Sequence, residues 1–91
     1  MKVRFFAAAA AAAGVKELDV PLQDIEHDGG TLAALLGHLP HAVPATGASG
    51  PPLHRVLSRS SFLVNEIGAR DESRPLADAD VIDVLPPFAG G

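Results

Sequence analysis

One leucine-faced helix among short β-forming segments is the feature that most restricts the fold of this chain. After Thr31, a good N-cap, leucines recur at the i, i+3, i+4, i+7 spacing of one helix face: Leu32, Leu35, Leu36 and Leu39. Pro40 predicts the end of this helix, because proline lacks the backbone N–H that a continuing helix needs. A single amphipathic helix buries its apolar face against a sheet, which indicates a two-layer α+β fold.

Four segments have the composition of β-strands, and they cover residues 2–6, 16–20, 62–65 and 81–85. The first two are expected to pair as an antiparallel hairpin. The first and last can lie side by side and parallel, with the helix in the connection between them. A mixed sheet with this strand-strand-helix-strand-strand order is the β-grasp arrangement, and a chain of 91 residues makes one such domain, residues 1–91.

The connections are rich in alanine or in turn-forming residues. The alanine run 7–13 predicts a short helical turn that ends at a left-handed Gly14, and an extended loop is the alternative for its first two alanines. Residues 41–52, rich in proline and glycine, predict a flexible surface loop. Residues 53–57 predict one helical turn packed on the core, and residues 66–74 predict a polar connection.

The alternation of the first and last strands predicts a buried face and an outer face. Arg4 and Asp83 fall on the outer face, where we expect them to pair across the two strands. An exposed pair of this kind contributes about 0–1 kcal/mol. The positions assigned to the core are Val3, Phe5, Ile82 and Val84.

An apolar patch is also predicted on the outer face, near the point where the last strand ends. It is assigned to Phe6, Leu85 and Val81. Large exposed apolar side chains beside a functional element indicate a surface for a partner protein. The alternative is that Phe6 is tucked under the alanine turn and serves packing alone.

The last strand runs directly into a short tail: Pro86, Pro87, Phe88, Ala89, Gly90 and Gly91. Glycine has no Cβ, so this backbone can enter a narrow channel and adopt unusual φ/ψ values. We therefore expect residues 86–91 to act as a flexible stalk that presents the Gly91 carboxylate to a partner. The alternative is a frayed chain end with no role.

Composition and charge exclude several function classes. The absence of cysteine excludes disulfides, thiolate metal sites and a cysteine nucleophile, and it suits the cytoplasm. A net charge of −4 without a basic stripe argues against nucleic-acid binding, and neither a signal peptide nor a membrane span is expected. No metal site is predicted, because the four histidines lack ligand spacing and the aspartates at 78, 80 and 83 are too sparse for calcium.

Taken together, these residues resemble the ubiquitin-like sulfur carriers of the MoaD/ThiS family, and within it the small subunits of molybdopterin synthase. The resemblance spans nearly the whole chain. It is carried by the opening residues 3–7, the helix 32–39, the strand 62–65, the turn 76–80 and the ending 85–91. A terminal Gly-Gly directly after a strand is the most specific of these marks.

The resemblance implies a carrier that undergoes chemistry without catalysing it and binds no cofactor of its own. In this family an adenylyltransferase of the ubiquitin-activating type uses ATP and magnesium to adenylate the C-terminal carboxylate, here that of Gly91. A sulfurtransferase system then gives the thiocarboxylate. The sulfur passes to a pterin precursor in the large subunit of molybdopterin synthase, a heterotetramer, during molybdenum cofactor biosynthesis.

By the same resemblance, the partner-binding residues are expected to be Phe6, Leu85, Val81, Pro86 and Pro87. Sibling carriers that serve cysteine or thiamine biosynthesis, tRNA thiolation or lysine conjugation also end in Gly-Gly. The Pro-Pro-Phe lead favours the molybdopterin branch, and the cysteine branch is the main rival because its tail also ends in Ala-Gly-Gly. A noncovalent β-grasp binding module, which would tolerate loss of Gly91, is the alternative from a different class.

Overall fold

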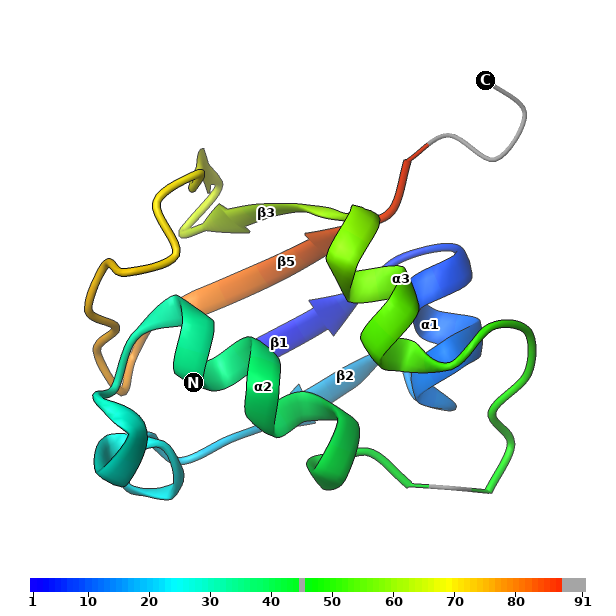
Figure 1. Cartoon of the computed structure of the whole chain (residues 1–91), viewed down its shortest axis with the longest axis horizontal. Coiled ribbons are helices and arrows are strands. Elements are labelled where there is room, and N and C mark those ends of the chain that lie inside the picture. Colours follow the sequence, from blue (N-terminus) through cyan, green and yellow to red (C-terminus); the bar gives the residue numbers. More distant parts are fainter. Residues whose placement is uncertain (45, 88–91) are drawn as a thin grey trace.

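A five-stranded mixed sheet forms the centre of the computed structural model, and helices lie across one of its faces (Figure 1). The structure describes residues 1–44 and 46–87. The strand order is β2-β1-β5-β3-β4, which confirms the predicted α+β, β-grasp class and adds one short strand. The strands are β1 (Lys2–Phe5), β2 (Glu17–Asp19), β3 (Ser61–Val64), β4 (Ile67–Gly68) and β5 (Val81–Leu85).

The first and last strands lie at the middle of the sheet, as predicted. β1 pairs with β2 in antiparallel fashion and with β5 in parallel, while β5 pairs on its other side with β3. Because β5 has a neighbour on both edges, it is held firmly along its whole length. The parallel register aligns Arg4 with Asp83 and Phe5 with Val84.

The helical segments are two 3-10 turns and three α-helices: η1 (Leu22–Asp24), η2 (Glu26–Asp28), α1 (Ala8–Ala13), α2 (Leu32–Ala42) and α3 (Leu53–Arg59). Thr31 caps α2 as predicted, since its Oγ1 accepts a hydrogen bond from the backbone N–H of Ala34 at 3.2 Å. The predicted stop at Pro40 is wrong, because α2 continues to Ala42. Proline removes one donor but has a helical φ, so it is tolerated this close to the helix end.

The alanine run forms α1, and Gly14 closes it in the left-handed conformation with φ 78°, as predicted. A Cβ at Gly14 would lie 2.9 Å from the carbonyl oxygen of Thr46, so both the backbone angle and the close contact require glycine. Ser49 donates a backbone hydrogen bond to Ala11 at 2.8 Å. Residues 46–49, in the connection between α2 and α3, therefore contact the C-terminal half of α1 and its Gly14 cap.

The connection at residues 66–74, predicted to be a polar loop, begins with β4. Asn65 and Glu66 form a two-residue turn and both have positive φ, 52° and 69°. This is the backbone of a type I′ hairpin, for which Asn-Gly is the usual sequence signal. Because glutamate and not glycine occupies the second position, this hairpin was not predicted from the sequence.

The core lies between the sheet and the helices. The predicted positions Val3, Phe5, Ile82 and Val84 are all buried. On α2, Leu32, Leu35 and Leu39 are fully buried, whereas Leu36 is half-buried at the edge of the core. The helix face was thus predicted correctly, with Leu36 on its margin.

Asp80 fixes the turn that leads into β5. Its Oδ2 accepts a hydrogen bond from the backbone N–H of Ala77 at 2.8 Å, and its Oδ1 accepts one from Asn65 Nδ2 at 2.9 Å. Asn65 in turn accepts from the backbone N–H of Val81 at 2.9 Å. These donors lower the pKa of Asp80, the backbone hydrogen bond from Ala77 most of all.

We expect Asp80→Asn to destabilise the protein by about 0.5–1.5 kcal/mol at pH 7, because an amide group replaces one of the two acceptor oxygens. A carboxylate with a lowered folded-state pKa stabilises the fold above its unfolded pKa, and this contribution is lost as the pH falls through the folded value. The difference in unfolding free energy between wild type and variant should therefore shrink below about pH 4. Urea titrations at pH 7, 4 and 3 measure it, and a difference that stays constant would contradict the assignment.

Candidate functional site at the tail root

The candidate site is the tail root, which we define as Leu85, Pro86 and Pro87. Here the central strand β5 leaves the sheet, at the end of the molecule where α1 and α3 lie (Figure 1). The two prolines cannot donate to a strand ladder, so the sheet ends at Leu85. Phe88, Ala89, Gly90 and Gly91, predicted to form the reactive tail, lie outside the described residues.

The outer patch, which we define as Phe6 and Leu85, lies beside the tail root on the sheet face that the helices leave open. Phe6 is 43% exposed, and its backbone N–H donates to the Val84 carbonyl at 3.3 Å. Leu85 is half-buried. Phe6 is therefore exposed beside the end of β5 and is not tucked under the alanine turn.

Val81 does not join this patch. It is aligned with Lys2 at the opposite end of the strand, four residues or about 13 Å before Leu85. Its side chain lies on the same outer face, but Asp83 separates it from the tail root. The expectation that Val81 lies near the tail is wrong, because Val81 and Leu85 are at opposite ends of the same strand.

Leu63 is an outer-face residue that the sequence analysis missed. It is half-buried, it is aligned with Asp83, and it lies one step diagonally from Leu85 on the neighbouring strand. The alternation that places Phe62 and Val64 in the core is the signal that would have identified it. Leu63 extends the apolar surface of the outer patch toward β3.

The predicted pair of Arg4 and Asp83 forms at the centre of the outer face. Nε of Arg4 donates to Oδ1 at 2.5 Å, and Nη2 donates to Oδ2 at 2.8 Å, so the pair is bidentate. The hydrogen bond that Arg4 donates to Asp83 is the main cause that raises the pKa of Arg4. Asp83 is only 4% exposed, which corrects the expectation of a fully exposed pair, because Arg4 and the flanking strands cover the carboxylate.

On the helix side, the tail root borders a small pocket of about 200 Å³, which we call the tail-root pocket. Two arginines of α3, Arg55 and Arg59, line it at i, i+4 spacing, and both are exposed. No sequence pattern connects them with the tail root, because this proximity depends on how α3 packs. The pocket lining consists of Ala8, Pro51, Arg55, Val56, Arg59, Pro86 and Pro87.

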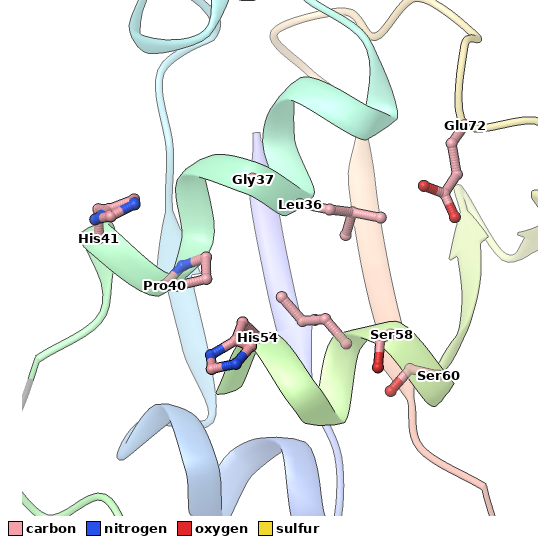
Figure 2. Close-up of a pocket in the computed structure, with 9 residues that line it drawn as sticks. Leu36, Gly37, Pro40, His41, His54, Ser58, Ser60 and Glu72 are labelled. Carbon is pink, nitrogen blue, oxygen red and sulfur yellow. The ribbon is translucent and has the colours of Figure 1, made fainter. Parts of the chain in front are cut away.

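A larger groove of about 500 Å³ lies between α2 and α3 (Figure 2). Its lining includes the exposed side chains of His41, His54 and Glu72 and the more buried side chains of Leu36 and Leu57. The side chains of α3 that line this groove differ from those that line the tail-root pocket. In the described part of the chain, no group of three or more His, Cys, Asp or Glu side chains is arranged to hold a metal ion.

Comparison with known proteins identifies relatives over almost the full chain. Residues 3–91 match the sequence model described as the ThiS family. Comparison with curated proteins gives no match. Within residues 1–44 and 46–87, no helix has the length and apolar character needed to cross a bilayer.

Solved structures of three relatives have the same fold. Small archaeal modifier protein 1 from Haloferax volcanii is 25% identical, with a TM-score of 0.69 and coverage of 100% of this chain and 98% of that chain. The modifier protein from Methanosarcina acetivorans is 26% identical, with a TM-score of 0.64 and coverage of 99% and 94%. A chain in the complex of subunits 1 and 2 of molybdopterin-converting factor from Helicobacter pylori is 24% identical, with a TM-score of 0.62 and coverage of 99% and 96%, and it supports the fold alone.

Proposed function

The chain belongs to the ThiS family of ubiquitin-like sulfur carriers, and from this premise we propose that Gly91 carries sulfur as a thiocarboxylate for molybdenum cofactor biosynthesis. The family match supports the sulfur-carrier part of the proposal, because it extends through Gly91 and includes the strand that leads to it. The Pro-Pro-Phe lead into the tail favours the molybdopterin branch. β5 is paired on both sides, so it fixes the direction in which the tail leaves the sheet. The tail itself consists of the four residues that follow Pro87.

The proposed chemistry begins with activation of the Gly91 carboxylate, which is a poor electrophile. A carboxylate oxygen attacks the α-phosphorus of ATP, bound with magnesium by an adenylyltransferase, and pyrophosphate leaves. A sulfide equivalent from a sulfurtransferase then displaces AMP and leaves the thiocarboxylate. The sulfur is softer and more nucleophilic than the oxygen it replaces, so it suits transfer to carbon.

Catalytic groups for these steps are proposed to come from the partner proteins. Of the described residues that line the tail-root pocket, none is a carboxylate, a histidine or a hydroxyl. Insertion of a side-chain-free tail into a partner's active site places the reacting carbon close to the catalytic groups. Positioning of this kind can contribute roughly 7–11 kcal/mol to the lowering of a barrier.

The proposed partners are the adenylyltransferase, the sulfurtransferase and the large subunit of a molybdopterin synthase heterotetramer. The outer patch of Phe6 and Leu85, together with Pro86 and Pro87, is proposed to dock them. Exposed Phe6 supports this role, because it gives a partner an aromatic anchor next to the entering tail.

Sulfur transfer to a defined acceptor tests the molybdopterin assignment. The thiocarboxylated chain would be mixed with a molybdopterin synthase large subunit and the cyclic pterin precursor, and in parallel with a cysteine-forming acceptor system. The assignment predicts dithiolene formation in the first reaction only. Cysteine formation without dithiolene product would instead assign the chain to the sulfur carriers that serve cysteine biosynthesis.

Protein modification is the second candidate, and the likeness to two archaeal modifier proteins at 25% and 26% identity favours it. In that role Gly91 would form an isopeptide bond to a lysine side chain of another protein. Mass spectrometry of digested cell extract would reveal lysines bearing the Gly91 end. Such peptides are expected for a modifier and are absent for a carrier dedicated to one sulfur pathway.

We expect Phe6→Asp to leave the fold intact and to raise the adenylyltransferase KM by about tenfold or more, because it replaces an apolar anchor with a charge. Ile67→Asp is the matched control, since Ile67 is 69% exposed on β4, away from the tail root. Initial rates of pyrophosphate release against carrier concentration measure both variants. Equal KM values for the two variants would remove Phe6 from the docking surface.

A further inference from the structure

We propose that Arg55 and Arg59 form a carboxylate-binding subsite that docks acidic side chains of the partner protein receiving the tail. The inference rests on the proposed function, because it concerns the partner surface around the inserted tail. It proposes that the partner protein recognises the helix side of the tail root as well as the outer patch. The occupant is an acidic protein surface at the rim of the tail channel.

The geometry of α3 brings Arg55 and Arg59 to the pocket beside the tail root. Arg55 and Arg59 are four residues apart, so they lie on one face of the helix, one turn from each other. Both line the tail-root pocket with Pro86 and Pro87, and both are exposed. The buried residues Leu53, Val56 and Leu57 anchor the other face of α3 in the core.

Neither guanidinium is used within the fold as far as the structure describes it. The ion pairs formed by residues 1–44 and 46–87 involve Met1, Arg4 and His27, and the side-chain hydrogen bonds include no donor from Arg55 or Arg59. Arg4, by contrast, is held by both oxygens of Asp83. The arginines of α3 are therefore available for a ligand.

The charges of the chain are distributed unequally between its two ends. The segments that form the tail-root end, residues 6–16, 46–61 and 85–87, contain Lys16, Arg55 and Arg59 but no aspartate or glutamate. All 11 acidic residues lie elsewhere in a chain of net charge −4. A positive end on an acidic protein attracts an acidic surface and orients the tail toward it.

The two sides of the tail root present different chemistry to the same partner. Side chains alternate along an extended strand, so Leu85 lies on the outer face with Phe6, whereas Pro86 turns toward the helix side and lines the pocket. A partner that encloses the tail contacts both sides. Guanidinium groups bind carboxylates through paired N–H donors, which favours aspartate and glutamate at that rim.

Kinetics of adenylation test the subsite in the full chain, with the adenylyltransferase that modifies the wild-type protein. The test variant is Arg55→Glu/Arg59→Glu, and the control is Lys2→Glu/Arg70→Glu at exposed positions away from the tail root. Each substitution changes the charge by two units, so both double variants carry −8 instead of −4. Initial rates of pyrophosphate release would be measured at low and high salt.

We expect the test variant to raise KM by at least about tenfold with kcat nearly unchanged, and we expect less than about threefold for the control. The wild-type KM should rise with salt, and this dependence should weaken in the test variant. Arg55→Gln/Arg59→Gln, which removes charge without reversing it, provides a second test if the double reversal unfolds.

An unchanged KM in both test variants, or an equal rise in test and control variants, would overturn the subsite while leaving the proposed function intact. A loss confined to kcat would also overturn it, because docking residues act on binding. Failure of every candidate adenylyltransferase to modify the wild-type chain would instead overturn the proposed function and this inference together.

Discussion

Replacement of Gly91 by alanine is expected to leave the fold unchanged and to reduce adenylation by at least about 100-fold. The core lies within β1, β5 and the helices, and Gly91 is six residues beyond the end of β5, so folding does not depend on it. The proposed reaction requires the terminal carboxylate to reach catalytic groups of the partner, and displacement of a reacting group by about 1 Å can cost 100-fold in rate. Deletion of Gly91 or a one-residue extension should have at least as large an effect.

Gly37→Ala is the matched control for this substitution. Gly37 lies within α2, and a Cβ there would meet no atom within 4 Å, so the added methyl group has space. Alanine in a helix interior is favoured over glycine by up to about 1 kcal/mol, so this variant should be as stable as wild type or more stable, and fully active. Adenylation of Gly91→Ala at the wild-type rate would contradict the carrier mechanism.

The second large effect concerns stability. Leu35→Ala is expected to lower the free energy of unfolding by about 2–5 kcal/mol, because Leu35 is fully buried at the contact of α2 with the sheet. Small domains have a total stability of only about 5–15 kcal/mol, so this variant is expected to lose a large share of it. Urea unfolding, followed by circular dichroism, measures the change.

Leu36→Ala is the control, since Leu36 is half-buried and lines the groove between α2 and α3. It makes the same chemical change one position along the helix, at a side chain that buries less apolar area when the protein folds. Its loss should be about 1 kcal/mol or less. Equal losses at the two positions would show that the buried face of α2 is wrongly assigned.

The parts of the fold that the sequence predicted are those governed by local periodicity. Alternation identified β1 and β5, and leucine spacing identified the buried face of α2. The pairing of Arg4 with Asp83 was predictable because the first and last strands were expected to lie side by side and parallel. The structure has this arrangement and aligns the two residues. The capping roles of Thr31 and Gly14 followed from side-chain chemistry alone.

The parts that the sequence did not predict depend on packing between distant segments. The turn of Asn65 and Glu66 lacks the glycine that usually marks such a hairpin. The burial of Asp83 depends on its neighbours across the sheet, and no local pattern specifies it. The distance of Val81 from the tail root, by contrast, follows from the rise of a single strand and was predictable.

The candidate site also contains residues that the sequence predicted and residues that only the folded structure identified. The proposed reactive end, Gly91, and the exposed anchor, Phe6, were found from residue type and alternation. Arg55 and Arg59 were not, because their position beside the tail root depends on how α3 packs against α1 and α2. Recognition residues on a neighbouring helix require the folded structure.

The most direct test of the central claim is the intact mass of the purified full chain after incubation with its adenylyltransferase, magnesium-ATP and a sulfur donor. Thiocarboxylate formation on Gly91 predicts a mass gain equal to replacement of one oxygen by sulfur, located in the C-terminal peptide that ends at Gly91. An unchanged mass, with an enzyme shown to be active on a control carrier, would exclude the sulfur-carrier role and favour a noncovalent binding module.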